Sequence, residues 1–523
     1  MSLRCDVAVI GTGFAGSLLA MALRRMGRSV VLIDRTHHPR FVIGESTTPL
    51  TNLLLEDFAK AFDLPEVASL AKWGSWQKRH PELACGLKRG FTFYHHRRRE
   101  RFQDDAQHSA QLLVAASPSE TVADTHWYRP DFDQFLCQQA ETLGARCQFD
   151  TRVKSMTTSR DGCALQLERA GATEELRAQW VVDASGARGS LFRLLELSET
   201  PLPNLPRTQS LFAHFSGVCP TQSLEEFQSA EAPPYPPDAA ATHHLFEGGW
   251  IWVLPFNNGI TSAGVALVPE LAGELGLSDG AAAWGRLLEL LPSVRRQFEH
   301  SQATTPFVHQ PVMPFCCSPI VGEGWSLLPS AAGFVDPLFS TGFPMTLLGL
   351  HRMTTLFRKH WGSSSIAAEM ELYALETRKD IDGAARFIAA CYPQLGNSRK
   401  FAALAKLYFA AVIFAETSRR LGRPGAAGAG FLMRDHPGYS AAMAGCLAKA
   451  AEASAEQLEA MVAAAIDPID LGGLNDPRWK NWIPVDFDAL RRAREKVGAS
   501  SEEIEGLIEK ACRGLAQESP LES

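Results

Sequence analysis

The sequence predicts an α/β fold in which an open α/β domain is interleaved with a β-sheet domain and followed by a helical region. Between Cys5 and Asp34 a strand, a glycine-rich turn, a helix and a second strand follow one another. Strand-like segments recur mainly at 80–128 and 203–315, and helical spacing dominates from Ile366 onward. We therefore expect one interleaved module at 1–354, an all-helical region at 355–523, and a ragged tail after about Gly514.

The first strand and turn have the spacing of a dinucleotide-binding unit. The turn reads Gly11-x-Gly13-x-x-Gly16, and the second strand ends at Asp34. Gly11 permits the tight turn, Gly13 lets the backbone approach a pyrophosphate, and Gly16 allows close packing of the helix on the strand. The start of the helix offers free N–H groups to phosphates. Asp34 can accept two ribose hydroxyls, which favours FAD or NAD over NADP.

Composition restricts the class of protein. Of 523 residues, 46% are apolar and 21% charged, which is typical of a globular protein. The net charge of −7 predicts no attraction to nucleic acid or anionic membranes. No apolar run approaches 18 residues, and the first strand begins at once, so we expect neither a membrane span nor a signal peptide. Eleven irregularly spaced cysteines fit reduced thiols in a cytoplasmic protein. Oligomeric state stays open, and no metal-ligand cluster is predicted.

One loop and one strand hold polar side chains that need an explanation. Residues 35–49 contain Glu45 and Ser46, and they form either a loop past the cofactor or a connector to a helix beginning near Pro49. Residues 84–94 alternate like a strand, with Lys88 between small and apolar neighbours. Most lysines in such places are solvated, so a catalytic role for Lys88 does not follow from the pattern alone.

The second half of the module contains a tryptophan pair and a candidate anion site. Trp250 and Trp252 lie two apart in a strand and share one face, which is usually a hydrophobic face of a sheet. Ser340, Thr341 and Gly342 precede an apolar helix. Ser340 or Thr341 is expected to cap that helix, and the helix end can still offer one or two N–H groups to an anion. The Pro- and Ala-rich residues 228–241 resemble an insertion or a lid.

These stretches together resemble the flavin-dependent halogenases, a branch of the FAD monooxygenase superfamily. Residues 249–255, GWIWVLP, resemble the G-W-x-W-x-I-P signature with Leu254 in place of Ile. Residues 334–342 resemble the F-x-D-P-x-x-S-x-G signature. Residues 84–91 resemble the segment that carries the essential lysine, which makes Lys88 the candidate catalytic residue. The likeness is strongest to enzymes acting on phenols or pyrroles, and it covers residues 5 to about 350.

The resemblance implies a chemistry and a set of site residues. Reduced FAD and O₂ would oxidise chloride or bromide, held at Thr341 and Gly342, to hypohalous acid, which would pass through a tunnel to Lys88 and then to an electron-rich ring. Trp250 and Trp252 would separate the substrate from the flavin. The implied FAD contacts are Gly11, Gly13, Ala15, Gly16, Asp34, Glu45, Ser46, Arg129, Val153, Asp336, Gly342 and Phe343. The implied substrate pocket or tunnel comprises Trp250, Trp252, Phe91, Phe93, Pro255, Phe339 and Ser340.

Three departures from the family refine this expectation. Phe339 stands where tryptophan halogenases place a glutamate, which favours a phenol or pyrrole that needs less help to lose its ring proton. Pro329-Ser330 replaces the superfamily's Gly-Asp, so Asp336 or backbone would contact the flavin instead. No second nucleotide motif is present, so a separate flavin reductase would supply FADH₂ through transient contact.

Two other classes remain open from the sequence. One is an FAD-dependent hydroxylase or monooxygenase of aromatic rings, and the other is a non-catalytic FAD-binding partner protein. Within the halogenase interpretation, the ring, the carbon modified, the preferred halide and attachment of the substrate to a carrier protein are not determined.

Overall fold

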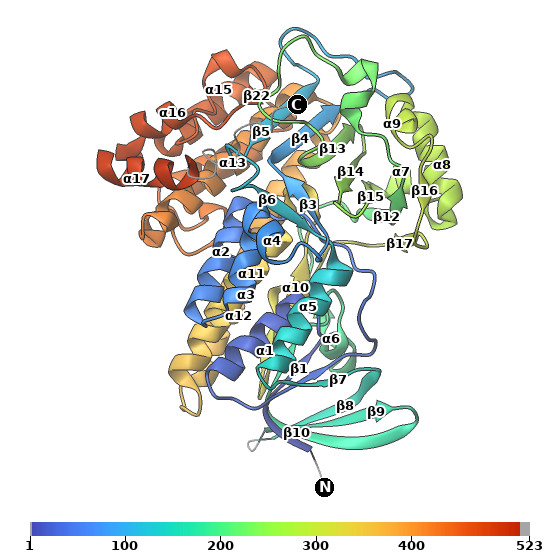
Figure 1. The fold of residues 1–523 in the computed structure, drawn as a ribbon, viewed down its shortest axis with the longest axis vertical. Coiled ribbons are helices and arrows are strands. Elements are labelled where there is room, and N and C mark those ends of the chain that lie inside the picture. The colour runs from blue at the N-terminus through green and yellow to red at the C-terminus, as the bar shows by residue number, and fades with distance from the viewer. Residues whose placement is uncertain (1–2, 160–161, 513–523) are drawn as a thin grey trace.

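The computed structural model describes residues 3–159 and 162–512, so the tail predicted after Gly514 lies outside the described residues. Two large sheets occupy opposite ends of the molecule, and most of the C-terminal helices lie beside the second sheet (Figure 1). The predicted α/β fold, with one dinucleotide-type sheet, one larger β domain and a helical C-terminal region, is confirmed.

The first sheet contains the predicted strand–turn–helix–strand unit. Its main path is β19-β20-β10-β1-β2-β7, with β8 and β9 added as an antiparallel extension. The bounds are β1 (Leu3–Ile10), β2 (Val30–Ile33), β7 (Arg146–Gln148), β8 (Thr151–Ser159), β9 (Gly162–Arg169), β10 (Ala172–Asp183), β19 (Val321–Gly322) and β20 (Trp325–Leu327). The parallel strands β1, β2, β10 and β20 end at the same edge, where open α/β sheets bind ligands.

The second sheet joins segments that are far apart in the chain. Its path is β16-β12-β15-β14-β13-β4-β5-β22, and β17 pairs with β12. The bounds are β4 (Gly90–His95), β5 (Gln111–Ala115), β12 (Gln209–Ser216), β13 (Ala241–Phe246), β14 (Gly249–Pro255), β15 (Ile260–Leu267), β16 (Gln302–Ala303), β17 (Val308–Gln310) and β22 (Trp482–Ile483). Ile251 and Val253 pack toward α8, whereas Trp250 and Trp252 join the main core. The predicted shared face of the tryptophans is confirmed.

The strand predicted over residues 84–94 is two strands. β3 (Cys85–Lys88) pairs with β6 (Asp124–Trp127), while β4 begins at Gly90 and enters the large sheet. The backbone N–H of Arg89 donates to the Ala239 carbonyl instead of continuing either ladder. Because of this break, Lys88 ends a strand that pairs with β6, while the residues from Gly90 onward belong to the large sheet.

The remaining strands and helices complete the layers. The small sheet is β11 (Ser198–Glu199), β18 (Phe315–Ser318) and β21 (Gly333–Phe334). The helices up to residue 360 are α1 (Phe14–Arg25), α2 (Pro49–Ala61), α3 (Pro65–Ala68), α4 (Trp73–Arg79), α5 (Arg129–Thr142), α6 (Ser190–Leu194), α7 (Pro269–Glu274), α8 (Ala281–Leu290), α9 (Pro292–Gln297), α10 (Pro329–Ala332) and α11 (Gly342–His360). The side chain of Thr48 caps α2 by accepting from the N–H of Thr51, as predicted for a helix starting at Pro49.

The C-terminal region is helical with one exception. It comprises α12 (Ile366–Cys391), α13 (Ser398–Arg420), α14 (Tyr439–Lys449), α15 (Ala455–Ile466), α16 (Phe487–Arg492) and α17 (Ser501–Cys512). The exception is β22, which pairs with β5 and extends the large sheet. The boundary predicted at residue 354 falls inside α11, and the division into two regions stays a prediction.

Helix α13 is long and apolar enough to cross a membrane by length and composition. However, 72% of its most apolar window is buried inside the protein. It packs against α2 and α15, as the core helix of a helical layer does. The apolar character of α13 is therefore accounted for by packing.

Candidate active site

A cavity of about 990 Å³ lies at the carboxyl edge of the first sheet and extends to the second sheet. Many residues singled out from the sequence line this cavity. They are Gly11, Gly13, Ala15, Asp34, Glu45, Ser46, Arg129, Val153, Trp250, Trp252, Asp336, Ser340, Thr341, Gly342 and Phe343. The predicted site residues outside its lining are Gly16, Lys88, Phe91, Phe93, Pro255 and Phe339.

The glycine turn is shaped as a cradle for a phosphate. A Cβ atom at Gly16 would lie 2.0 Å from the carbonyl oxygen of Gly11, so the helix can pack here only without a side chain. Gly13 is the N-cap of α1 and has no capping side chain. A Cβ atom at Gly13 would meet only the ends of flexible side chains, including Arg129 and Arg40 at 3.7 Å. Bare N–H groups next to two guanidinium groups suit a pyrophosphate, so these residues fit a dinucleotide.

Asp34 lies at the end of β2, where a ribose is expected. Its carboxylate accepts from the backbone N–H and the hydroxyl of Thr12, at 2.9 and 2.8 Å, and forms an ion pair with Arg40 at 2.7 Å. Burial alone raises the pKa of Asp34, but Arg40 and the bonds from Thr12 hold the pKa below its usual value. Asp34 is therefore an ionised acceptor. Thr36 also donates to it through its backbone N–H and its hydroxyl, so a ribose hydroxyl would take the place of one of these donors.

Residues 43–48 form a loop, here called the partition loop, between the cavity and β3. Arg129 donates to the carbonyl of Gly44 at 2.8 Å and is itself paired with Asp133. His214, on the large sheet, contacts the Glu45 carboxylate at 2.8 Å, and both side chains are 1% exposed. The loop is thus held by Arg129 of α5 on one side and by His214 of the large sheet on the other.

Lys88 lies behind the partition loop and is completely buried. Its Nζ donates to the hydroxyl of Ser46 at 2.9 Å and to the carbonyl of Thr47. It also lies 3.7 Å above the ring centroid of Phe91. Burial lowers the pKa of Lys88, and the nearby Asp124 carboxyl opposes that shift only in part. Since Ser46 lines the cavity, one side chain separates the amine from the cavity.

Of the remaining predicted pocket residues, Phe91, Phe93 and Phe339 belong to an aromatic cluster, whereas Pro255 ends β14 outside it. The ring centroids of Phe93 and Phe339 are 5.7 Å apart, and those of Phe91 and Phe93 are 6.1 Å apart. The C-terminal region completes the cluster with Phe401, Tyr408 and Phe409. Phe339 has a φ of 63°, which is unusual for a bulky residue, and the hydroxyl of Tyr408 donates to its carbonyl at 2.8 Å.

The start of α11 is open to the cavity. The structure shows no side-chain hydrogen bond that caps this helix, so the capping interpretation of Ser340 or Thr341 is wrong. The hydroxyl of Thr341 instead donates to the carbonyl of Asp336 at 3.4 Å. A Cβ atom at Gly342 would meet nothing within 4 Å. Uncapped N–H groups at a helix start, facing an open space, suit a small anion.

A buried polar network at this turn involves a residue that sequence reasoning missed. The hydroxyl of Tyr392 donates to Asp336 at 2.7 Å, and the indole N–H of Trp250 donates to Tyr392 at 3.3 Å. Burial raises the pKa of Asp336 to about 6 despite these bonds. Tyr392 follows α12, 56 residues from Asp336, so no local pattern indicated this contact.

We expect Tyr392→Phe to destabilise the protein in a pH-dependent way. The Tyr392 hydroxyl lowers the pKa of Asp336, so its removal raises that pKa further and destabilises the ionised form of the buried carboxyl. The free energy of unfolding should fall by about 1.5–3 kcal/mol relative to the unmutated protein, as expected for loss of a bond to a charged group. This decrease should develop as the pH rises through about 6 and become smaller below that pH. Denaturant unfolding on both sides of this pH measures it. The control is Tyr373→Phe, which removes a bond to the neutral Leu327 carbonyl, and its loss should not vary with pH.

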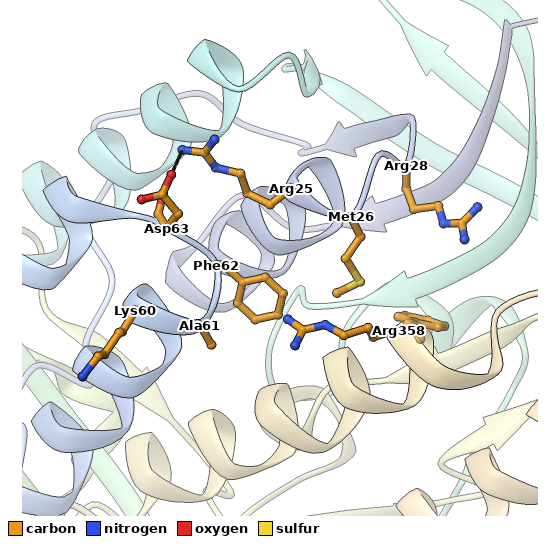
Figure 2. Close-up of a pocket in the computed structure, with 9 residues that line it drawn as sticks. Arg25, Met26, Arg28, Lys60, Ala61, Phe62, Asp63 and Arg358 are labelled. Atoms are coloured by element: carbon orange, nitrogen blue, oxygen red, sulfur yellow. Dashed lines mark hydrogen bonds and ion pairs between the residues drawn. The ribbon is translucent and has the colours of Figure 1, made fainter.

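A second hollow lies away from this cavity, where α1, α2 and α11 end (Figure 2). It is lined by Arg25, Arg28, Lys60 and Arg358, and Arg25 contacts Asp63 at 3.4 Å. Arg25, Lys60 and Arg358 each lie in the last turn of a helix, where cations offset the partial negative charge of the helix end. Stabilisation of these helix ends therefore explains this cluster of basic side chains.

Residues 3–159 and 162–512 contain no group of three His, Cys, Asp or Glu side chains placed to hold a metal ion.

The predicted lid, residues 228–241, is anchored by several hydrogen bonds. The hydroxyl of Tyr235 donates to the carbonyl of Phe91 at 2.5 Å, and Asp238 accepts from the N–H of Thr221 at 3.0 Å. The carbonyl of Ala239 also accepts from the N–H of Arg89. This segment is therefore tied to the large sheet and to the turn that follows β3.

Comparisons with known proteins extend these observations. The model of the family "FAD dependent oxidoreductase" matches residues 6–335. Monodechloroaminopyrrolnitrin halogenase PrnC of Pseudomonas fluorescens is 27% identical, covering 79% of this chain and 72% of that protein. Tetracycline 7-halogenase of Kitasatospora aureofaciens is 32% identical, but the match spans 65% of this chain and 61% of that protein. The structure of halogenase PltM with phloroglucinol and FAD has a TM-score of 0.78 at 23% identity, covering 90% and 99% of the two chains.

Proposed function

We propose that this chain, which belongs to the FAD-dependent oxidoreductase family as a flavin-dependent halogenase, installs chloride or bromide on an electron-rich phenolic ring. In this proposal the halogen reaches the ring through Lys88. The observation that carries the proposal is the position of Lys88. Its buried amine is separated from the cofactor cavity only by the partition loop, and it donates to Ser46, which lines that cavity.

The residues that would hold FAD are those that line the cavity. Gly13 and Arg129 suit the pyrophosphate, Asp34 the ribose, and the turn at Asp336 and Gly342 the ring system. When bound and reduced, FAD would supply the equivalents that let O₂ oxidise a halide to hypohalous acid. The chain's own part is to keep the halide at the uncapped start of α11 and to keep bulk water away from the cavity.

Lys88 would then receive the halogenating species. A neutral amine is the form that can accept hydrogen bonds or bind halogen, and burial favours this form over the ammonium. Trp250 and Trp252 would form a wall of the cavity that keeps the ring substrate apart from the cofactor. The aromatic cluster around Phe93 and Phe339 would supply flat apolar surfaces for a ring, and Phe339 adds no carboxylate to it.

The partners follow from the same proposal. A separate flavin reductase would deliver FADH₂ by transient contact. The substrate would be a small aromatic molecule, either free or attached to a carrier protein. Two relatives at 25–26% identity are named as a brominase and a chlorinase of pyrrole-2-carbonyl groups on a peptidyl carrier protein. These names support testing a carrier-attached substrate as well as a free one.

Mass spectrometry of a phenol panel tests the proposed function. The protein is incubated with FAD, a flavin reductase, NADH and bromide, and the products are analysed. We expect a product with the bromine isotope doublet that is absent without bromide. A gain of one oxygen instead would assign the protein to the hydroxylases. A panel of carrier-bound phenols and pyrroles distinguishes a tethered substrate from a free one.

Thr341 should set the halide requirement. We expect Thr341→Val, which removes the hydroxyl and keeps the shape, to raise the halide concentration for half-maximal halogenation by about tenfold, the effect of about 1.4 kcal/mol. Halide titration of product formation measures this change. Thr354→Val is the matched control, because the Thr354 hydroxyl donates to the Leu350 carbonyl within the same helix and lies outside the lining of the cavity. An unchanged halide dependence in Thr341→Val would remove Thr341 from the halide site.

A further inference from the structure

A second ionisable side chain is buried opposite Lys88 and has no role in the chemistry described so far. Asp124 begins β6 and is 5% exposed. In the antiparallel pair of β3 and β6, Lys88 lies directly opposite Asp124. Side chains at such positions extend from the same face with Cβ atoms about 4.5–5.5 Å apart. Among the described residues the two do not form a direct ion pair, because Nζ of Lys88 donates to Ser46 and Thr47 instead.

The carboxyl group of Asp124 is half satisfied. Oδ1 accepts from the amide of Asn52, on α2, at 2.8 Å. Oδ2 is buried and has no hydrogen-bond partner in the part of the chain that the structure describes. A buried carboxylate oxygen without a partner is costly, whereas a carboxyl that can take up a proton avoids that cost.

Asn52 ties this carboxyl to the partition loop. Its amide also donates to the hydroxyl of Thr47 at 3.1 Å, and the carbonyl of Thr47 is the acceptor for Lys88. The Thr47 hydroxyl in turn donates to the carbonyl of Thr125, next to Asp124, at 2.7 Å. Asp124, Asn52, Thr47 and Lys88 are therefore one connected cluster contributed by β6, α2, the loop and β3.

We propose that Asp124 is the proton partner of Lys88, accepting the proton that the buried ammonium must release before the amine can act as a nucleophile. This inference rests on the proposed function. In the step, one N–H bond of the ammonium breaks and one O–H bond forms at Asp124. The charged pair becomes a neutral amine and a neutral carboxylic acid, and no electrons are exchanged. The flexible chain of Lys88 brings Nζ from the partition loop to Oδ2.

The surrounding charges are consistent with a pair that shares one proton. Burial raises the pKa of Asp124 and lowers that of Lys88, and each group's charge opposes the shift of the other. From α13, Glu416 raises the pKa of Asp124 and Arg420 lowers it, and these two are themselves paired at 2.7 Å. His126 and His243 face Lys88, and burial lowers the pKa of both to about 3, so they are neutral.

Asp124→Asn tests the inference, because asparagine keeps the shape and can still accept from Asn52. The carboxylate raises the pKa of Lys88, so its removal should lower that pKa by about one unit or more. The pKa is read from NMR of the full-length protein with isotope-labelled lysine Nζ, the Lys88 signal being identified by its loss in Lys88→Met. In parallel, the acidic limb of halogenation per flavin oxidised should move to lower pH.

Two further variants make the outcome decisive. Asn52→Leu removes the bond that stabilises the Asp124 anion, so it should shift the Lys88 pKa in the same direction by a smaller amount, and it replaces Asp124→Asn if that protein does not fold. Asp238→Asn neutralises another carboxyl whose pKa is raised by burial, and it should leave Lys88 unchanged. An unchanged Lys88 pKa in the first two variants, or an equal shift in Asp238→Asn, would overturn the inference. A shifted pKa with no halogenated product from any substrate would instead refute the proposed function.

Discussion

Lys88→Ala should abolish halogenation while leaving flavin oxidation by O₂ in place. The amine is the only part of the side chain that can hold the halogenating species, and its removal should lower product formation by at least about 10³-fold, as loss of a nucleophile does in other enzymes. FAD binding should persist, because Lys88 lies outside the lining of the cofactor cavity and supports it only through its hydrogen bond to Ser46. The measurement is halogenated product formed per FADH₂ oxidised, with free hypohalous acid trapped by an added phenol.

Three companion variants separate loss of the amine from loss of packing. Lys88→Met fills the same volume and should be as inactive as alanine. Lys88→Arg keeps a charge, but a guanidinium does not deprotonate in proteins, so it should also be inactive. Lys406→Met removes another lysine whose pKa is lowered by burial, on the C-terminal helix α13, and it should halogenate normally. Normal halogenation by Lys88→Ala or Lys88→Met would exclude Lys88 from the chemistry.

Gly16→Ala should destroy the cofactor site by breaking the fold of the turn. The new Cβ atom would lie 2.0 Å from the Gly11 carbonyl oxygen and 3.2 Å from the Cβ of Ala184. Because the first of these is a backbone atom, the helix must move off the strand. We expect a loss of about 1–3 kcal/mol or more in the free energy of unfolding, together with loss of FAD binding. Thermal unfolding and the flavin absorbance of the purified protein measure the two effects.

Gly13→Ala is the matched comparison, because it should impair FAD binding without disturbing the fold. Its Cβ atom would meet Asp133 Oδ2 at 3.4 Å and two guanidinium groups at 3.7 Å, all of them side-chain ends. We expect a stable protein that binds FAD weakly, since the new methyl occupies the approach to the pyrophosphate. Gly285→Ala, on the surface of α8 with nothing within 4 Å, should leave FAD binding unchanged and raise the free energy of unfolding by about 0.5–1 kcal/mol, because alanine is the better helix former. Equal behaviour of Gly13→Ala and Gly16→Ala would contradict the separate roles given to these glycines.

Local patterns predicted most of the first sheet. The glycine turn, the helix after it and the acid at the end of the second strand depend on backbone conformation and on residues within about 30 positions of each other. The shared face of Trp250 and Trp252 also follows from the two-residue period of a strand. The same reasoning failed at residues 84–94, where a continuous alternation concealed a break at Arg89 that only the hydrogen bond to Ala239 reveals.

The interpretation of the turn at residues 340–342 depended on tertiary structure as well. Sequence alone favoured a capping side chain, although an open helix end uses the same residue types at the same spacing. The structure leaves α11 uncapped, since the Thr341 hydroxyl is engaged by the carbonyl of Asp336. The Tyr392 hydroxyl, from a region with no recognisable signature, holds the Asp336 side chain.

The sequence by itself determined the dinucleotide unit, the helical C-terminal region and the candidate lysine, because each depends on short-range periodicity or on a motif in contiguous residues. Only the tertiary structure placed Lys88 behind the partition loop, opposite Asp124 and above the ring of Phe91. The physical reason is that burial and cross-strand register set the charge of an amine, and both arise from contacts between segments far apart in the sequence.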